Sequence, residues 1–360
     1  MTALPSVAQV RNQLLIPPED NTALSLYSTV VLPAEKAASK ADQIMYARVV
    51  GYLFLYSPNS TALSTLKLEL ASCNSSSDDS VRFEAVYDLG MVYVRHLICI
   101  FRKPRGKTPV PSDFPSRKLK SSPRNHIDAK NAALVRDDYR CMLTRAVDLR
   151  SLKDEVAVQR WPEEQINATQ CSHIFPDSLD STEVGESGDQ VLAMAWTMLK
   201  RFGYEDVCRE LKADAKGTNL HRLENILTLA RSFQHAFDLM DLWLEAIPDK
   251  ANHYRVVLAS YMTHKGFGLP ENIQFVAHGN RDLPLPSPRY LSVHAACCRI
   301  AHMSGAAKHL DVIFRDMEEL DVLAEDGASA EVLTYALHHL VTSRVARSWS
   351  PVCNEDVPET

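Results

Sequence analysis

The sequence predicts an α+β fold that is predominantly helical. Stretches near both ends repeat apolar residues at the three- and four-residue spacing of a helix, and short apolar runs in the middle are typical of strands. The 360 residues are enough for two or three modules. We therefore expect N- and C-terminal helical modules that flank a centre built from a β-hairpin and a helix.

The N-terminal helical module is predicted over residues 1–101. We expect a strand at 26–32, a helix from Pro33 to about residue 56, and a second helix over 81–101. Pro33 suits the first turn of a helix, where its missing N–H would have no partner. The two helices are expected to pack together through their apolar faces.

Residues 102–127 are predicted to form a basic, proline-rich linker. Between 102 and 124, eight lysines and arginines face a single aspartate, and five prolines interrupt regular structure. The stretch is either a solvated linker or an arm that contacts phosphates. The formal net charge of the whole chain is −6, which argues against a dedicated nucleic-acid-binding protein.

The rest of the chain divides into a central domain at 128–248, a C-terminal strand and helix region at 249–345 that packs on it, and a tail at 346–360. The elements expected there are a helix over 128–139, a strand beginning at 140–144, a strand over 168–175, helices over 191–201 and 225–246, strands over 254–262 and 272–278, and three short helices between 289 and 340.

Eight cysteines without any C-x-x-C spacing argue against a zinc ribbon and a disulfide framework, and favour reduced thiols. The N-terminus lacks the features of a secretion signal, and no apolar run is long enough to span a membrane. We expect an intracellular protein, cytoplasmic or nuclear, that is neither secreted nor membrane-bound.

Three polar anchors stand out in the central domain: Cys171-Ser-His173-Ile-Phe-Pro176, Asn225, and Gln234-His235-Ala-Phe-Asp238. They are preceded by Arg136-Asp-Asp-Tyr-Arg-Cys-Met-Leu-Thr144 and followed by Leu242-Trp-Leu-Glu245 and by the stretch 283–296. Together these motifs resemble the HNH nuclease family, a ββα-metal fold, and more closely its fungal branch. The resemblance covers about two thirds of the chain.

This resemblance implies a β-hairpin packed on a helix, with one divalent metal between them. His173 would be the general base that takes a proton from the attacking water. Asn225, at the opening of the helix, would hold the hairpin loop and orient that base, and a histidine nine residues later would bind the metal. Ser172 stands where the wider family often has another metal ligand, and it is a poor one.

The third anchor departs from the family pattern. The residue nine positions after Asn225 is Gln234, and the histidine follows as His235, which a helix rotates by about 100°. Either the metal site is lost, or a shifted helix aims His235 and Asp238 at the metal. A second departure is Arg145, where relatives often have glycine, and it would distort a turn or fill the cleft.

Three functions follow. The favoured one is a repurposed, cofactor-independent enzyme that binds a small apolar molecule under the C-terminal helices, with His173, Asn225 and Gln234 assisting an acid–base, cyclisation or pericyclic step in fungal specialised metabolism. The alternative is a DNA endonuclease that uses His173 as base and His235 and Asp238 to hold Mg²⁺, Mn²⁺ or Zn²⁺. The third is a non-catalytic interaction protein.

Two further groups of residues have two interpretations each. His221 and Arg222 either line the cleft and contact an anionic ligand, or are ordinary exposed loop residues. Cys171 and Cys141 lie on the paired strands near the centre, where a thiol beside His173 could be a nucleophile. The other interpretation is a small buried thiol with a packing role.

Overall fold

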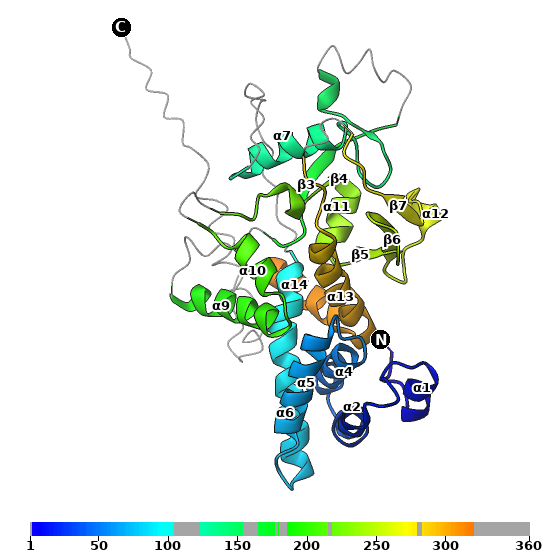
Figure 1. Ribbon diagram of the computed structural model, residues 1–360, viewed down its shortest axis with the longest axis vertical. Coiled ribbons are helices and arrows are strands. Elements are labelled where there is room, and N and C mark those ends of the chain that lie inside the picture. The colour runs from blue at the N-terminus through cyan, green and yellow to red at the C-terminus, as the bar shows by residue number, and fades with distance from the viewer. Residues whose placement is uncertain are drawn as a thin grey trace.

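The computed structural model describes residues 2–103, 123–153, 165–176, 179, 186–214, 218–278 and 283–319. The fold is α+β and mostly helical, which confirms the predicted class (Figure 1). Most of the predicted linker and the whole predicted tail lie outside the described residues, as does the third of the expected C-terminal helices.

The N-terminal module is helical throughout its described length. Its elements are α1 (Val7–Asn12), α2 (Asn21–Leu26), a π-helical turn (Tyr27–Val31), α3 (Leu32–Ala37), α4 (Ala41–Leu55), α5 (Ser60–Cys73), α6 (Asp79–Tyr93), a π-helical turn (Val94–Ile98) and a 3-10 turn (Cys99–Phe101). The strand predicted at 26–32 is wrong. Val30 and Val31 are buried there, so packing overrides the strand propensity of β-branched residues. The helix α5 was not predicted.

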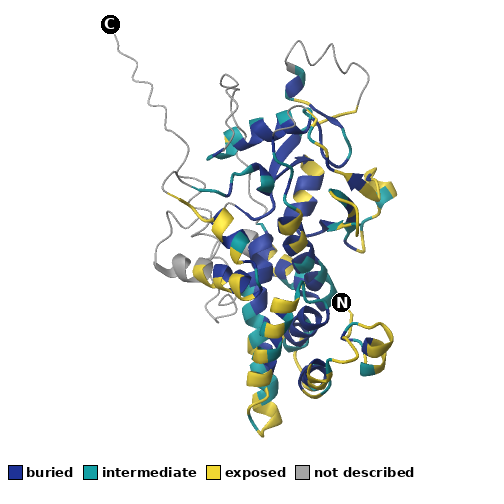
Figure 2. Cartoon of the chain, in the orientation of Figure 1, coloured by how far each residue is buried: buried dark blue, intermediate teal, exposed yellow. Residues whose placement is uncertain are grey.

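Helix α4 is the centre of this module and is buried over most of its surface from Met45 onward, whereas α5 and α6 beside it also carry exposed residues (Figure 2). It is apolar on nearly all sides, which is typical of a helix enclosed by others. Helix α6 approaches it closely at Gly90, where an added Cβ would lie 2.4 Å from the backbone oxygen of Tyr46. The predicted pairing of the two long N-terminal helices is confirmed.

A two-stranded antiparallel sheet lies in the middle of the chain between two helices. Its strands are β3 (Thr169–His173) and β4 (Ile226–Ala230), with Cys171 opposite Thr228. Helix α7 (His126–Arg136) packs on one face of the pair, and α11 (Arg231–Asp238) packs on the other (Figure 1).

The single helix predicted over 225–246 is wrong. Asn225 ends a 3-10 turn (Leu223–Asn225), β4 follows it, and only 231–238 is helical before β5 (Leu242–Ala246) begins. A short apolar run such as Ile226–Ala230 fits a strand and a buried helix equally well by periodicity. Large apolar residues of this stretch, such as Phe233, Phe237 and Trp243, are nevertheless buried.

The remaining strands form two small sheets. Strand β5 pairs with β6 (His253–Leu258), which pairs with β7 (Asn272–Gln274), so the predicted strands near 254 and 272 are confirmed. The predicted domain boundary at 248 falls in the connection between β5 and β6. The other elements are β1 (Val147–Asp148) parallel to β2 (Ile166–Asn167), a 3-10 turn (Ser151–Lys153), α9 (Glu186–Arg201), α10 (Glu205–Leu211) and α12 (His264–Phe267).

Two C-terminal helices, α13 (Pro288–Ser304) and α14 (Ala306–Glu319), join the two ends of the fold. Gly305 lies between the two helices and ends α13, and its φ of 95° is left-handed and favours glycine. Helix α13 packs on both α4 and β5, so one continuous core runs from the N-terminal module to α11. This core holds the β3–β4 pair in a fixed place.

Candidate functional site

Asn225 fixes the chain that follows His173. Its side-chain oxygen accepts a hydrogen bond from the backbone N–H of Phe175 at 2.8 Å, and its amide donates to the backbone oxygens of Phe175 and Leu220, both at 2.8 Å. The residue is fully buried. Both amide hydrogens are used in these bonds, so Asn225 holds the loop, as the resemblance implied. It does so from the end of a 3-10 turn, directly before β4, and not from the opening of a helix.

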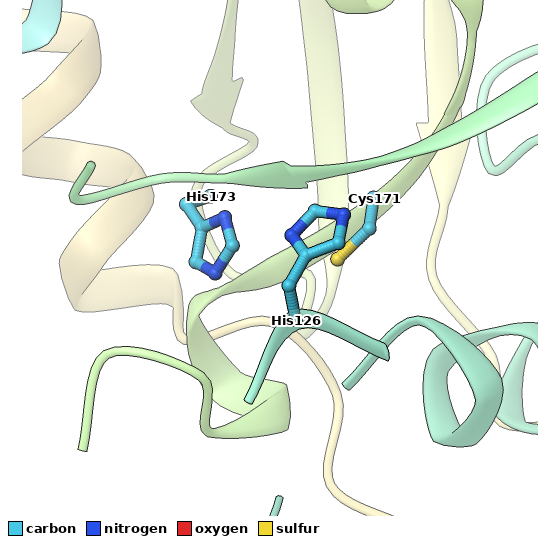
Figure 3. A group of neighbouring side chains, drawn as sticks. All are labelled: His126, Cys171 and His173. Atoms are coloured by element: carbon cyan, nitrogen blue, oxygen red, sulfur yellow. The ribbon is translucent and has the colours of Figure 1, made fainter. Parts of the chain in front are cut away.

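On the α7 face of the sheet, side chains with nitrogen and sulfur atoms meet. One ligand atom each of His126, Cys171 and His173 lies within 4.8 Å of the others. His126 is the first residue of α7, and Figure 3 shows its ring between the two side chains from β3. Cys171 and His173 share this face because side chains two apart in a strand point the same way.

His221 extends this cluster. Its Nδ1 lies 2.9 Å from Nε2 of His173, and the two rings meet edge to face with centroids 5.0 Å apart. The His126 ring is 5.7 Å from that of His173 and 6.4 Å from that of His221, measured between centroids. His221 is therefore not an isolated loop residue, because its ring contacts His173. We call His126, Cys171, His173 and His221 the imidazole cluster.

Two buried polar side chains border the imidazole cluster. Lys130 lies one turn along α7 from His126 and is 6% exposed, and no described residue is a hydrogen-bond partner of its Nζ. Burial lowers the pKa of Lys130, and the charges that act on it include those of Asp148 and Cys171. Thr228, opposite Cys171, also has a buried hydroxyl with no hydrogen-bond partner among the described residues.

The α11 face of the same sheet carries a different arrangement. Gln234 donates its amide to Asp238 Oδ2 at 2.5 Å, and Ser172 donates its hydroxyl to Oδ1 at 3.4 Å. The Lys103 ammonium lies 2.7 Å from Oδ1. The Lys103 backbone N–H also donates to the backbone oxygen of Asp238 at 3.0 Å. We call Lys103, Ser172, Gln234 and Asp238 the carboxylate cluster.

The predicted catalytic residues His173, Asn225 and Gln234 do not converge on one pocket. Gln234 and Ser172 meet on the α11 face, whereas His173, the next residue of β3, points to the α7 face. His235 is exposed, and Asp238 bonds to Gln234 instead. The predicted pairing of His235 with Asp238 as metal ligands is therefore absent from the described structure.

The predicted roof over the site also differs from the structure. Helix α13 covers α11, where His294 stacks on Phe237 with ring centroids 4.0 Å apart. The segment before α13 lies nearer the α7 face, where Leu283 packs with Ala129 and Ile226. Within the described residues, the C-terminal helices thus pack on the α11 side of the sheet.

Arg145 occupies a position that favours glycine. Its φ is 63°, in the left-handed region, and its N–H donates to the backbone oxygen of Cys141 at 2.9 Å. The sequence offered two outcomes for Arg145, a distorted turn or a filled cleft, and the structure places its backbone in a hydrogen-bonded turn with left-handed φ. Cys141 has a structural contact, because the Ala230 N–H donates to its sulfur at 3.3 Å.

The described ends of the basic linker bind other parts of the protein. Arg102 donates to the backbone oxygen of Leu239 and pairs with Asp311. Arg124 pairs with Asp214 at 3.1 Å and donates to the side chain of Asn219 at 2.6 Å. The phosphate-contacting arm predicted between them lies almost entirely outside the described residues.

Sequence reasoning missed His126 and Lys130. The helix was predicted to begin at 128, which left His126 in the linker. The four-residue spacing of His126 and Lys130, which puts both on one helix face, was the available signal.

Comparisons of the chain with family models, curated proteins and solved structures returned no match. No helix in the described parts of the chain has the length and apolar character needed to cross a membrane.

Proposed function

We propose that this chain is an enzyme of HNH-like architecture that carries out acid–base chemistry on a small, largely apolar molecule, without a metal on its α11 face. The observation that carries the proposal is the pairing of His173 with His221, 2.9 Å apart, on the sheet face opposite the carboxylate cluster. The succession β3, β4 and α11 supports the ββα architecture that the motifs suggested.

The carboxylate cluster does not suit a catalytic metal. Ser172 and Gln234, which stand at the ligand positions that the resemblance implies, offer a hydroxyl and an amide, both weak ligands for transition metals. The Lys103 ammonium already neutralises the Asp238 carboxylate at 2.7 Å. A divalent cation would have to displace it, so we derive no catalytic step from a metal there.

The imidazole cluster suits proton transfer. In the hydrogen bond between His173 and His221 one ring donates and the other accepts, so the two rings have complementary tautomers. Imidazoles exchange protons near neutral pH, and a positioned base or acid contributes about 10²–10⁴-fold to rate. His173 is the base in this proposal, and His221 orients it and takes up or returns its proton.

The surroundings of the imidazole cluster support an apolar substrate. Ala129, Leu223 and Ile226 are buried beside Cys171 in a separate small hydrophobic cluster. His126 and His221 are only half-buried, so they border the solvent-facing side of the site. Acid–base or hydrogen-bond-assisted cyclisation, of the kind expected from the sequence, matches a site with imidazoles in an apolar wall.

A general-base probe tests the proposal without knowledge of the natural substrate. Elimination of 5-nitrobenzisoxazole requires only the removal of one proton from a small apolar molecule. We expect metal-free protein to accelerate it over free imidazole, His173→Gln to lose at least about 10²-fold, and His235→Gln to retain the rate. Acceleration no greater than that of free imidazole, or equal in His173→Gln, contradicts the proposal.

Plasmid nicking tests the endonuclease alternative. The full chain is incubated with supercoiled DNA and Mg²⁺, Mn²⁺ or Zn²⁺, beside His173→Gln and His235→Gln. We expect no metal-dependent nicking. Nicking that both variants lose would restore the nuclease and its metal site at His235, and would overturn the acid–base proposal.

A further inference from the structure

We propose that His126, Cys171 and His173 bind a zinc ion between the first turn of α7 and strand β3. This site goes beyond the acid–base role proposed above, although it uses one of the same side chains. The three residues come from two elements only, and β3 is fixed by its pairing with β4 along its whole length.

The spacing of the three donor atoms suits one ion. Zinc binds imidazole nitrogen at about 2.0–2.1 Å and thiolate sulfur at about 2.3 Å, so tetrahedral ligand atoms lie about 3.3–3.7 Å apart. In the structure they lie within 4.8 Å of one another. Metal binding would draw the three donor atoms closer together, and His126, at the half-buried start of α7, is the least buried of the three residues.

The donor types select the class of metal. Two imidazoles and a thiolate are typical of zinc and other borderline or soft ions, whereas Mg²⁺ and Ca²⁺ prefer oxygen ligands. Three protein ligands leave a fourth tetrahedral position for water or for a ring nitrogen of His221. His221 is already 2.9 Å from His173 and would fix the orientation of that ring.

Thr228 gives this face a second feature that suits a bound thiolate. It lies directly opposite Cys171 in the β3–β4 register, it is 2% exposed, and no hydrogen-bond partner for its hydroxyl exists within the described structure. A hydroxyl in this place can donate to the sulfur of Cys171 once the metal has removed the thiol proton. Ligands held by outer hydrogen bonds of this kind bind metal more tightly.

Zinc and proton transfer compete for the same imidazole in this arrangement. A nitrogen lone pair of His173 that coordinates zinc is unavailable to take a proton. If the proposed acid–base function holds, one equivalent of zinc therefore inhibits it. Metal binding itself does not depend on that function, and the two can fail separately.

Cobalt substitution tests the site directly. The full-length, chelator-treated protein is titrated with Co²⁺, and then with Zn²⁺ in competition with a chromophoric chelator. We expect one equivalent of Co²⁺ to give a near-ultraviolet thiolate-to-cobalt charge-transfer band, and zinc to abolish it. Absence of the band, or Co²⁺ bound by oxygen and nitrogen alone, overturns the proposal.

Matched variants assign the ligands. Cys171→Ser should abolish the charge-transfer band, His126→Gln should weaken zinc binding at least tenfold, and Cys73→Ser and His235→Gln should change neither. Circular dichroism and thermal unfolding establish that each variant is folded, and Cys171→Ala provides a second, apolar replacement. A band that persists in both Cys171 variants places the metal elsewhere and refutes the site.

Elimination of 5-nitrobenzisoxazole by the same metal-free samples separates the two proposals. Inhibition by one equivalent of zinc in the wild type, relieved by chelator, is expected when both hold. Zinc binding without any base activity contradicts only the acid–base function. Base activity without zinc binding contradicts only the metal site.

Discussion

The Lys103 ammonium lies 2.7 Å from the Asp238 carboxylate, on the α11 face of the β3–β4 pair. Asp238 is 8% exposed, and its other contacts are the hydroxyl of Ser172 and the amide of Gln234. Lys103, at the start of the basic linker, thereby ties the segment that leaves the N-terminal module to the end of α11.

Removal of this ammonium should destabilise the fold. Lys103→Met leaves the Asp238 carboxylate buried without its cation, and we expect a loss of about 3 kcal/mol, the lower end for a buried pair, because the Lys103 side chain is 23% exposed. Urea unfolding of Lys103→Met, Asp238→Asn and the double variant measures the coupling. A double variant whose loss equals the sum of the single losses would show that the pair contributes no coupling energy.

Asn225 should contribute to stability rather than to chemistry. Asn225→Ala leaves the backbone N–H of Phe175 and the carbonyls of Phe175 and Leu220 buried without their partner. We expect a loss of about 3 kcal/mol or more in the free energy of unfolding. Asn219→Ala, at a half-buried amide nearby, is the control and should cost much less. A folded Asn225→Ala protein of wild-type stability would refute the clamp.

His294 should make the protein acid-sensitive. Burial between the Phe237 and Phe101 rings lowers the pKa of His294 to about 3. Between that pKa and the ordinary value of 6.5 the unfolded chain binds the proton and the folded one does not, so stability falls as pH falls through this window. His294→Phe should reduce this loss between pH 6.5 and pH 3. Parallel stability curves for the two proteins would contradict it.

Lys130 should destabilise the native state. Burial lowers the pKa of Lys130, so below its ordinary value of 10.5 the unfolded chain holds this proton more tightly than the folded one. Lys130→Met, which fills the same space without an unpaired amine, should stabilise by about 1 kcal/mol at pH 7. This advantage should shrink as pH rises toward 10.5. An advantage that stays constant or grows with pH contradicts the assignment.

The sequence was sufficient to predict that two long helices pair near the N-terminus, and the reason is physical. Long apolar patterns such as that of 81–101 repeat often enough to define a helix face. Asn225 was predicted to hold a loop, and it does. The stretch 225–246 was wrongly predicted as one helix. It contains a strand, a two-turn helix and another strand, and in this succession the apolar residues happen to lie near helical spacing.

The imidazole cluster could not be predicted from spacing alone. His126, Cys171 and His221 are separated by long stretches of chain, and only the packing of α7 on the sheet brings them together. The separation of His173 from Gln234 was equally hidden, because it depends on strand alternation at β3 and not on the helical count from Asn225. Tertiary contacts between distant segments leave no local pattern in a sequence.

Odd-numbered and even-numbered residues of β3 direct their side chains to opposite faces of the sheet. The odd positions 171 and 173 belong to the imidazole cluster, and the even position 172 belongs to the carboxylate cluster. Deletion of one residue ahead of Cys171 would exchange these two sets across the sheet, whereas deletion of two would keep each on its own side. Substitutions can therefore alter the carboxylate cluster and the imidazole cluster independently. Insertions or deletions in β3 keep both clusters on their own faces only when they change the strand's length by an even number of residues.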